Sequence, residues 1–209
     1  VPTGIQMAVF AIANMIIQSA VNSLGTTVMA ASSASFSIEV FAYYVLSSFS
    51  QACTTFTGQN HGAGNKVRCR KVLKNCILED LVFTALSILL ILFFGRQILS
   101  LFNPDADVIA TGYIRMLWVF SAYVFSMIYE NIAGYLRGFG ISLIPAILTI
   151  LGVCGVRITW IYTVFPLHRT FPSILSAYPA SMAVTAVLMV IALLVLKPSR
   201  EYAEQERKQ

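Results

Sequence analysis

The stretch TFPSILSAYPASMAVTAVLMVIALLVL, residues 170–196, contains no Asp, Glu, Lys or Arg. Three further tracts lack these residue types as well, namely 1–38, 81–95 and 138–156. A helix on the surface of a soluble domain needs a polar outward face, which these tracts do not provide. About 20 consecutive apolar residues are enough for one helix to cross the hydrocarbon core of a bilayer. The four tracts therefore predict a membrane protein.

The composition of the whole chain agrees with this prediction. The 209 residues are 57% hydrophobic and 11% charged, with a mean hydropathy of +0.77, whereas a soluble domain carries about 25% charged residues. An ordinary soluble enzyme, a disordered chain and a disulfide scaffold are therefore excluded. The four cysteines form no C-x-x-C pair and are interpreted as small apolar fillers, so neither a metal site nor a cofactor is expected.

Six apolar segments of about 20 residues or more can be counted, at about 5–24, 34–56, 77–101, 112–135, 142–165 and 174–196. The strict alternation over about ten residues that a membrane β-barrel requires is absent. We predict an all-α, polytopic membrane bundle of six transmembrane helices over residues 1–196, followed by a tail at 197–209. The chain begins with Val1 rather than Met, so we also expect a fragment of a longer protein.

Lysine and arginine are concentrated in three places: the connection at 58–75, the connection at 137–142 and the tail. Positively charged loops stay in the cytoplasm, which predicts that these segments and the C-terminus are cytoplasmic. The net charge of +5 could also suggest a nucleic-acid partner. Aromatic side chains that would stack on bases are not interleaved with the basic run, so no nucleic-acid partner is predicted.

Polar side chains recur every three or four residues within three of the segments, which places each set on one helix face. The sets are Asn14, Gln18 and Asn22 in the first segment, Glu39 and Tyr43 in the second, and Tyr123, Ser126 and Glu130 in the fourth. Polar groups are costly in hydrocarbon, so these faces point to a bundle interior or a water-filled cavity. One interpretation is that they line a substrate path. The other is that they form hydrogen bonds between helices.

Three charged residues lie well inside the predicted spans: Glu39, Glu130 and Arg157. At 1.5 Å rise per residue, Glu39 lies about 8 Å and Arg157 about 12 Å inside the outer ends of their segments, so a structural ion pair is predicted. Glu130 lies about 10 Å from Arg137 on the same arithmetic, with no cation at its own depth. Burial disfavours the charged form of an unpaired carboxyl, which makes Glu130 a candidate carrier of a proton or cation. The alternative is a protonated or hydrogen-bonded Glu at a helix contact.

Signatures of catalysis are absent. The sequence has no HExxH motif and no nucleophile elbow, and the glycines before Lys66 lack the spacing of a phosphate-binding loop, so no catalytic residue is assigned. These glycines instead predict a helix end and a tight turn, with Asn65 capping the following helix. Gly134 and Gly138 form a G-x-x-x-G motif, which favours close helix packing.

Several short sequence motifs follow one another in a fixed order, and this order identifies a protein family more specifically than any single motif does. Residues 2–6 open an apolar helix that leads to NSLGTTVMAA (22–31), and a second helix leads to GQNHGAG (58–64) with a basic run behind it. YLRGFG (135–140) and VCGVRITWIYTVFP (153–166) follow, with Tyr178-Pro179 in the last segment. In this order and spacing, the whole chain resembles the C-terminal half of a MATE (multidrug and toxin compound extrusion) transporter. The sequence at 153–166 is similar to that of a bacterial subgroup of this family.

The resemblance implies a twelve-helix exporter with two six-helix lobes around a central cavity, in which this chain supplies helices seven to twelve. Such exporters expel organic, often cationic, compounds in exchange for Na⁺ or H⁺ across the bacterial inner (plasma) membrane. The implied partners are the N-terminal six-helix lobe, small organic substrates and the lipid bilayer. Some sodium-coupled members carry acids in the first and fourth helices of this lobe. Here those positions fall near Phe10 and Ser126, neither of which is an acid. The resemblance therefore does not decide whether the coupling ion is Na⁺ or H⁺.

Two alternatives remain open at this point. A lipid-linked saccharide flippase of the same superfamily would line its cavity with several basic residues, and Arg157 alone is available within the spans. A structural or channel-like bundle without coupled transport would show no dependence of flux on an ion or proton gradient.

Overall fold

The structure, a computed structural model, describes residues 2–198, which form helices joined by short connections and contain no strand. In chain order, the helices are α1 (Pro2–Asn22), α2 (Thr26–Gly62), α3 (Lys66–Phe93), α4 (Gly95–Phe102), α5 (Ala106–Ser121), α6 (Tyr123–Gly138), α7 (Leu143–Thr149), the π-helix η1 (Ile150–Gly155), α8 (Val156–Thr163), α9 (Phe171–Leu175) and α10 (Ala177–Leu196). Residues 199–209, most of the predicted cytoplasmic tail, lie outside the described range.

Length and apolar character decide which of these helices can cross a membrane. Within residues 2–198, four stretches qualify: Thr26–Gly62, Lys66–Phe93, Leu143–Thr163 and Phe171–Leu196. The pair α5 and α6, bent by 48° at Ala122, is a fifth if it counts as one span. The prediction of an all-α membrane bundle is confirmed. The apolar part of α1, Ala8–Asn22, is shorter, and its crossing of the membrane stays a prediction.

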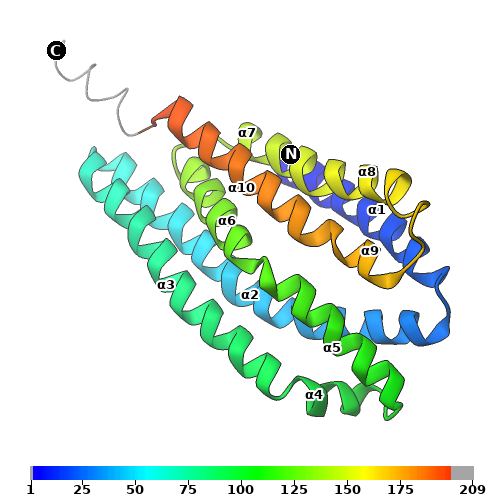
Figure 1. The fold of residues 1–209 in the computed structure, drawn as a ribbon. Coiled ribbons are helices and arrows are strands. Elements are labelled where there is room, and N and C mark those ends of the chain that lie inside the picture. Colours follow the sequence, from blue (N-terminus) through cyan, green and yellow to red (C-terminus); the bar gives the residue numbers. More distant parts are fainter. Residues whose placement is uncertain (1, 199–209) are drawn as a thin grey trace.

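The bent pair α5–α6 runs through the middle of the bundle (Figure 1). It packs against α2 on one side and α10 on the other, while α3 lies along α2, and α1 lies along α8. The turn between α2 and α3, the end of α6 and the end of α10 lie at the same end of the molecule (Figure 1). The two basic connections and Lys197, which follows α10, therefore lie at one end of the described bundle.

Local sequence explains the sharp turns between the first three helices. Gly25, between α1 and α2, has φ +107°, and Gly64, between α2 and α3, has φ +72°. A residue with a Cβ adopts this left-handed region only with strain, so glycine is suited to both positions. The Asn65 side chain accepts a hydrogen bond from the backbone N–H of Arg68, at 3.1 Å. The prediction that Asn65 caps the helix is therefore confirmed.

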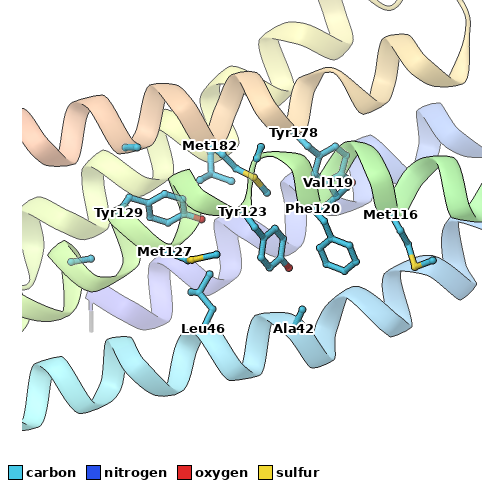
Figure 2. Packing of buried hydrophobic residues seen from close by; sticks show 14 of the residues in the cluster. Ala42, Leu46, Met116, Val119, Phe120, Tyr123, Met127, Tyr129, Tyr178 and Met182 are labelled. Atoms are coloured by element: carbon cyan, nitrogen blue, oxygen red, sulfur yellow. The ribbon is translucent and has the colours of Figure 1, made fainter. Parts of the chain in front are cut away.

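The core is built where α5 and α6 meet their two neighbours. In Figure 2, Met116, Phe120 and Met127 lie between the α2 ribbon and the α10 ribbon. Ala42 and Leu46 of α2 are fully buried on one side of these side chains. Val119, Tyr123, Tyr129, Tyr178 and Met182 complete the labelled part of this buried cluster. Packing of this kind fixes the positions of the polar side chains between the same helices.

Two glycines allow α6 to approach α2 closely. A Cβ added to Gly134 would overlap the backbone carbonyl oxygen of Ser50. A Cβ added to Gly138 would lie 2.6 Å from the Cβ of Thr57, which is too close for real atoms. The G-x-x-x-G motif therefore packs as the sequence predicts, with small residues at a helix contact.

The outward face of α3 carries large apolar side chains that are exposed on the surface of the bundle. Exposed members of this face include Leu78, Val82, Phe83, Leu86, Leu89, Leu90 and Phe93. An apolar surface this extensive is typical of a helix that contacts lipid. The inward face of the same helix is very different, because it carries the fully buried Asp80 and Thr84.

Candidate functional site

A cavity of about 270 Å³ lies between α1, α2, α5, α6, α8 and α10, together with one residue of η1. The structure brings six of the eight predicted polar residues to its wall, from three separate helices: Asn14, Glu39, Tyr43, Tyr123, Ser126 and Glu130. Three polar stripes that are far apart in the sequence therefore share one space. Their part in transport stays a prediction.

Aromatic and apolar side chains form the rest of the wall. The rings of Phe10, Phe36 and Tyr129 line it together with Tyr43 and Tyr123, and Val153 and Met182 contribute aliphatic surface. A lining that is mostly apolar, with a few polar groups, is the usual composition of a site for a small organic molecule.

The prediction that Glu39 pairs with Arg157 is wrong. Glu39 instead forms a two-pronged ion pair with Arg115 of α5, with Nε–Oε1 at 2.8 Å and Nη2–Oε2 at 3.0 Å. Arg115 also donates to Ser32 Oγ at 3.0 Å and to Tyr178 Oη at 3.2 Å. Both charged side chains are buried, at 3% and 7% exposure. We refer to Ser32, Glu39, Arg115 and Tyr178 as the Arg115 network.

The physical reason for this error lies in the start of the fourth segment. The predicted segment starts near residue 112, which puts Arg115 at the membrane boundary. The helix in fact begins at Ala106, so Arg115 lies about 14 Å along it at 1.5 Å per residue. Arg115 therefore reaches the depth of Glu39, and the planar guanidinium matches a carboxylate through two parallel hydrogen bonds.

Arg157 does not pair with Glu39, although both line the cavity. Its Nε donates to Ser181 Oγ at 2.9 Å. Its guanidinium lies over the Tyr178 ring, 4.4 Å from the centroid, and the guanidinium of Arg115 lies 5.1 Å from the same ring. Tyr178 therefore links the Arg115 network to Arg157 through cation–π contacts.

The prediction that Glu130 has no cation at its depth is also wrong. Arg137 Nη2 lies 3.7 Å from Glu130 Oε2, and the same nitrogen donates to Ser50 Oγ at 3.0 Å. Ser50 in turn donates to the backbone carbonyl of Glu130 at 2.7 Å. Arg137 follows Glu130 by seven residues, or two helical turns, so both lie on one face of α6. The long arginine side chain covers the axial distance that appeared to separate them.

The remaining two predicted residues lie outside this cavity. Gln18 lines a neighbouring hollow of about 280 Å³, which Asn14, Ser32 and Tyr178 also border. Asn22 accepts a hydrogen bond from Gln18 at 2.8 Å. That bond lies within α1, so it supplies none of the contacts between helices that one interpretation of the stripe required.

Asp80, a fully buried carboxylate on α3, is not among the residues predicted from sequence. Its oxygens accept hydrogen bonds from Thr84 Oγ1 at 2.6 Å and from Asn131 Nδ2 of α6. The predicted third segment began near residue 77, which put Asp80 at a boundary, whereas α3 begins at Lys66. Asp80 is therefore about 21 Å along the helix. Its i, i+4 spacing with Thr84 is the signal that could have shown a polar inward face.

A metal centre finds no support in the part of the chain that is described. No three His, Cys, Asp or Glu side chains within residues 2–198 are close enough together to hold a metal ion. The four cysteines, Cys53, Cys69, Cys76 and Cys154, are buried and free.

The MatE family model matches residues 2–163. The chain is 25% identical over 192 residues to the probable multidrug resistance protein YoeA of Bacillus subtilis (strain 168), which covers 90% of this chain and 41% of that protein. It is 24% identical over 157 residues to the probable multidrug resistance protein NorM of Thermotoga maritima, covering 75% and 34%.

A solved structure shares the fold. It is the outward-facing conformation of a multidrug resistance MATE family transporter of the MOP superfamily, with a TM-score of 0.81 at 18% identity. The match covers 94% of this chain and 43% of that one. The chain therefore spans about two fifths of the length of YoeA and of this solved transporter.

Proposed function

Because this chain belongs to the MatE family of membrane transporters, we propose that it is the C-terminal half of a multidrug efflux antiporter. In this proposal, residues 1–196 correspond to helices seven to twelve, and a separate N-terminal six-helix lobe supplies the opposite wall of the cavity. The protein exports organic compounds, often cationic ones, in exchange for Na⁺ or H⁺. The chain is part of a transporter rather than an enzyme.

The observation that carries the proposal is the shared cavity, where polar stripes from α1, α2 and α6 meet aromatic side chains. Aromatic rings accept flat organic molecules and, through their faces, organic cations. Transport would follow alternating access, in which one lobe rocks against the other around a site near the membrane midplane. We place the protein in the bacterial inner (plasma) membrane, with the basic end of the bundle and the C-terminus in the cytoplasm.

A pair of adjacent tyrosines tests the cavity directly. Tyr43 lines the cavity wall, whereas the neighbouring Tyr44 is 64% exposed and does not line it. In the full-length protein in vesicles, Tyr43→Ala should weaken the apparent affinity for an organic cation such as ethidium by about 2- to 10-fold. This follows from the loss of one aromatic contact, about 0.5–1.5 kcal/mol. Fluorescence-monitored efflux measures it, and Tyr44→Ala is the matched control. Equal effects of both variants would contradict the assignment of the cavity.

The need for a second lobe gives a separate expectation. A polar cavity wall without its counterpart would face lipid, which is costly. Residues 1–209 expressed alone should therefore give no resistance to ethidium in a pump-deficient bacterium, whereas the full-length protein should. Minimum inhibitory concentrations measure the difference, with immunodetection of both proteins in the membrane fraction as the control. Resistance conferred by this chain alone would overturn the two-lobe proposal.

A further inference from the structure

Three carboxylates of the described residues are buried among the helices, and one of them lacks a cation. Glu39 pairs with Arg115, and Glu130 with Arg137. Within residues 2–198, the partners of Asp80 are instead neutral donors, the hydroxyl of Thr84 and the amide of Asn131. An isolated ionised carboxylate in a low-dielectric interior is very unfavourable, and such a group takes up a charge-compensating ligand or becomes neutral. Of these three carboxylates, Asp80 is therefore the one whose negative charge is not compensated by a cationic side chain.

A second observation points to the same place. Asn131 is fully buried, and its side-chain oxygen, Oδ1, has no hydrogen-bond partner. Its Nδ2 is fully engaged, since it donates to Asp80 and to the backbone carbonyl of Met127, the latter at 2.9 Å. Buried polar atoms in native proteins nearly always have partners. The site between α3 and α6 thus contains both an uncompensated acid and an unsatisfied acceptor.

The donor set favours a proton over a metal cation. A Na⁺ ion needs several oxygen ligands, as other hard cations do, whereas Asn131 turns its amide nitrogen toward the Asp80 carboxylate. Thr84, one turn along α3, suits a proton better because a hydroxyl can donate or accept. It can donate to the ionised carboxylate across the 2.6 Å that separates Thr84 Oγ1 from Asp80 Oδ1. It can accept from the protonated one while turning its own hydrogen to the backbone carbonyl of the residue four positions earlier. Both protonation states therefore fit without a rearrangement of heavy atoms.

We propose that Asp80, held between Thr84 and Asn131, is a proton-binding site of this bundle and couples proton movement to export. The inference rests on the proposed function and specifies its coupling ion. Coupling requires that the affinity for the proton differ between the two access states. On α6, Glu130 lines the cavity while the next residue, Asn131, contacts Asp80. A shift of α6 in response to an occupied cavity therefore changes the surroundings of Asp80.

Among residues 2–198, few other titratable groups lie near this site. They are Cys76 and Glu79 on α3, Cys53 on α2, and Glu130 and Tyr135 on α6. The thiols and the phenol are neutral at physiological pH in their ordinary state. Glu79 is exposed, and Glu130 has its arginine. Toward the far end of α3, Arg96 lies over the ring of Tyr113, whose hydroxyl contacts the Leu92 carbonyl, about three turns from Asp80.

Infrared difference spectroscopy of the full-length protein in lipid provides the test, because a protonated carboxylic acid has its own C=O band. We expect such a band near neutral pH, its loss in Asp80→Asn, and its retention in Glu79→Gln, the matched control on the next residue. Thr84→Val should shift the band and its titration midpoint, because the hydroxyl partner is gone. Size-exclusion chromatography establishes that each variant is folded. If Asp80→Asn does not fold, the shift in Thr84→Val decides the question.

Transport measurements complete the test. Ethidium efflux driven by a pH gradient should lose its dependence on pH in Asp80→Asn and keep it in Glu79→Gln. A band that survives in Asp80→Asn, or an unchanged pH profile in that variant, would overturn the inference. A wild-type protein that exports no organic compound would overturn the proposed function instead, and the infrared band then decides the proton site by itself.

Discussion

Replacing Arg115 with Met should destabilise the bundle by about 3–5 kcal/mol, because it leaves the Glu39 carboxylate buried without its partner. Ser32 and Tyr178 lose their contacts with the guanidinium in the same variant. At about 2–4 °C per kcal/mol for a domain of this size, the midpoint of thermal aggregation should fall by roughly 10 °C. Heating the detergent-purified full-length protein and measuring the fraction that stays monodisperse provides the value.

Arg96→Met is the matched control for this change. Arg96 lies on the exposed side of α4 and contacts only the ring of Tyr113 among the described interactions, at 5.3 Å. Its loss should cost well under 1 kcal/mol, as for most exposed charges. The double variant Glu39→Gln/Arg115→Met removes both charges and should recover part of the stability. Equal midpoints for Arg115→Met and Arg96→Met would show that the Arg115 network does not hold α2, α5 and α10 together.

Gly134→Val should prevent α6 from docking on α2. The first atom of any side chain at this position would overlap the backbone carbonyl of Ser50, and a backbone atom cannot turn aside as a flexible side chain can. Overpacking of a core position costs about 1–3 kcal/mol or more. Here the displaced helix would also break the hydrogen bond from Ser50 to the Glu130 carbonyl. We expect a strong loss of folded protein in the membrane, measured as the monodisperse yield of a fluorescent fusion.

A second glycine separates this steric effect from the general cost of changing a helical glycine. A Cβ at Gly62, near the end of α2, meets no atom within 4 Å. Gly62→Val should therefore leave the yield close to that of the unmodified protein. A comparable loss in both variants would mean that close approach of α6 to α2 is not what Gly134 provides.

The helices and the cavity could be predicted from sequence because both follow from periodicity. Uncharged tracts long enough to span identify the helices, and polar residues three or four apart must share a face. That is why Glu39, Tyr123 and Glu130, though distant in sequence, were correctly expected to face inward. Pairing was less predictable, since it depends on the helix ends and on the direction in which long side chains extend.

Both wrong predictions have this origin. Arg115 was placed at a boundary because the helix start was set six residues too late, at 112 instead of Ala106. Arg137 was treated as a loop residue, although α6 continues to Gly138 and the side chain turns back along it toward Glu130. A buried acid without a cation is still a candidate carrier of a proton. Asp80 fits this description, and its depth along α3 was not predicted because that helix begins at Lys66 rather than near residue 77.

A π-helical turn holds one residue more than the α-helical turn that it replaces. The wide turn η1, Ile150–Gly155, therefore rotates everything after it by about 100° relative to an uninterrupted helix. Arg157 faces Tyr178 with that extra residue included. A homologous helix without the wide turn lacks the extra residue. In such a helix, the residue that occupies the place of Arg157 lies one position earlier in the sequence, counted from the helix start. An alignment of the two helices therefore needs a one-residue gap at the wide turn. Without that gap, residues after the turn are matched to residues on a different face of the other helix.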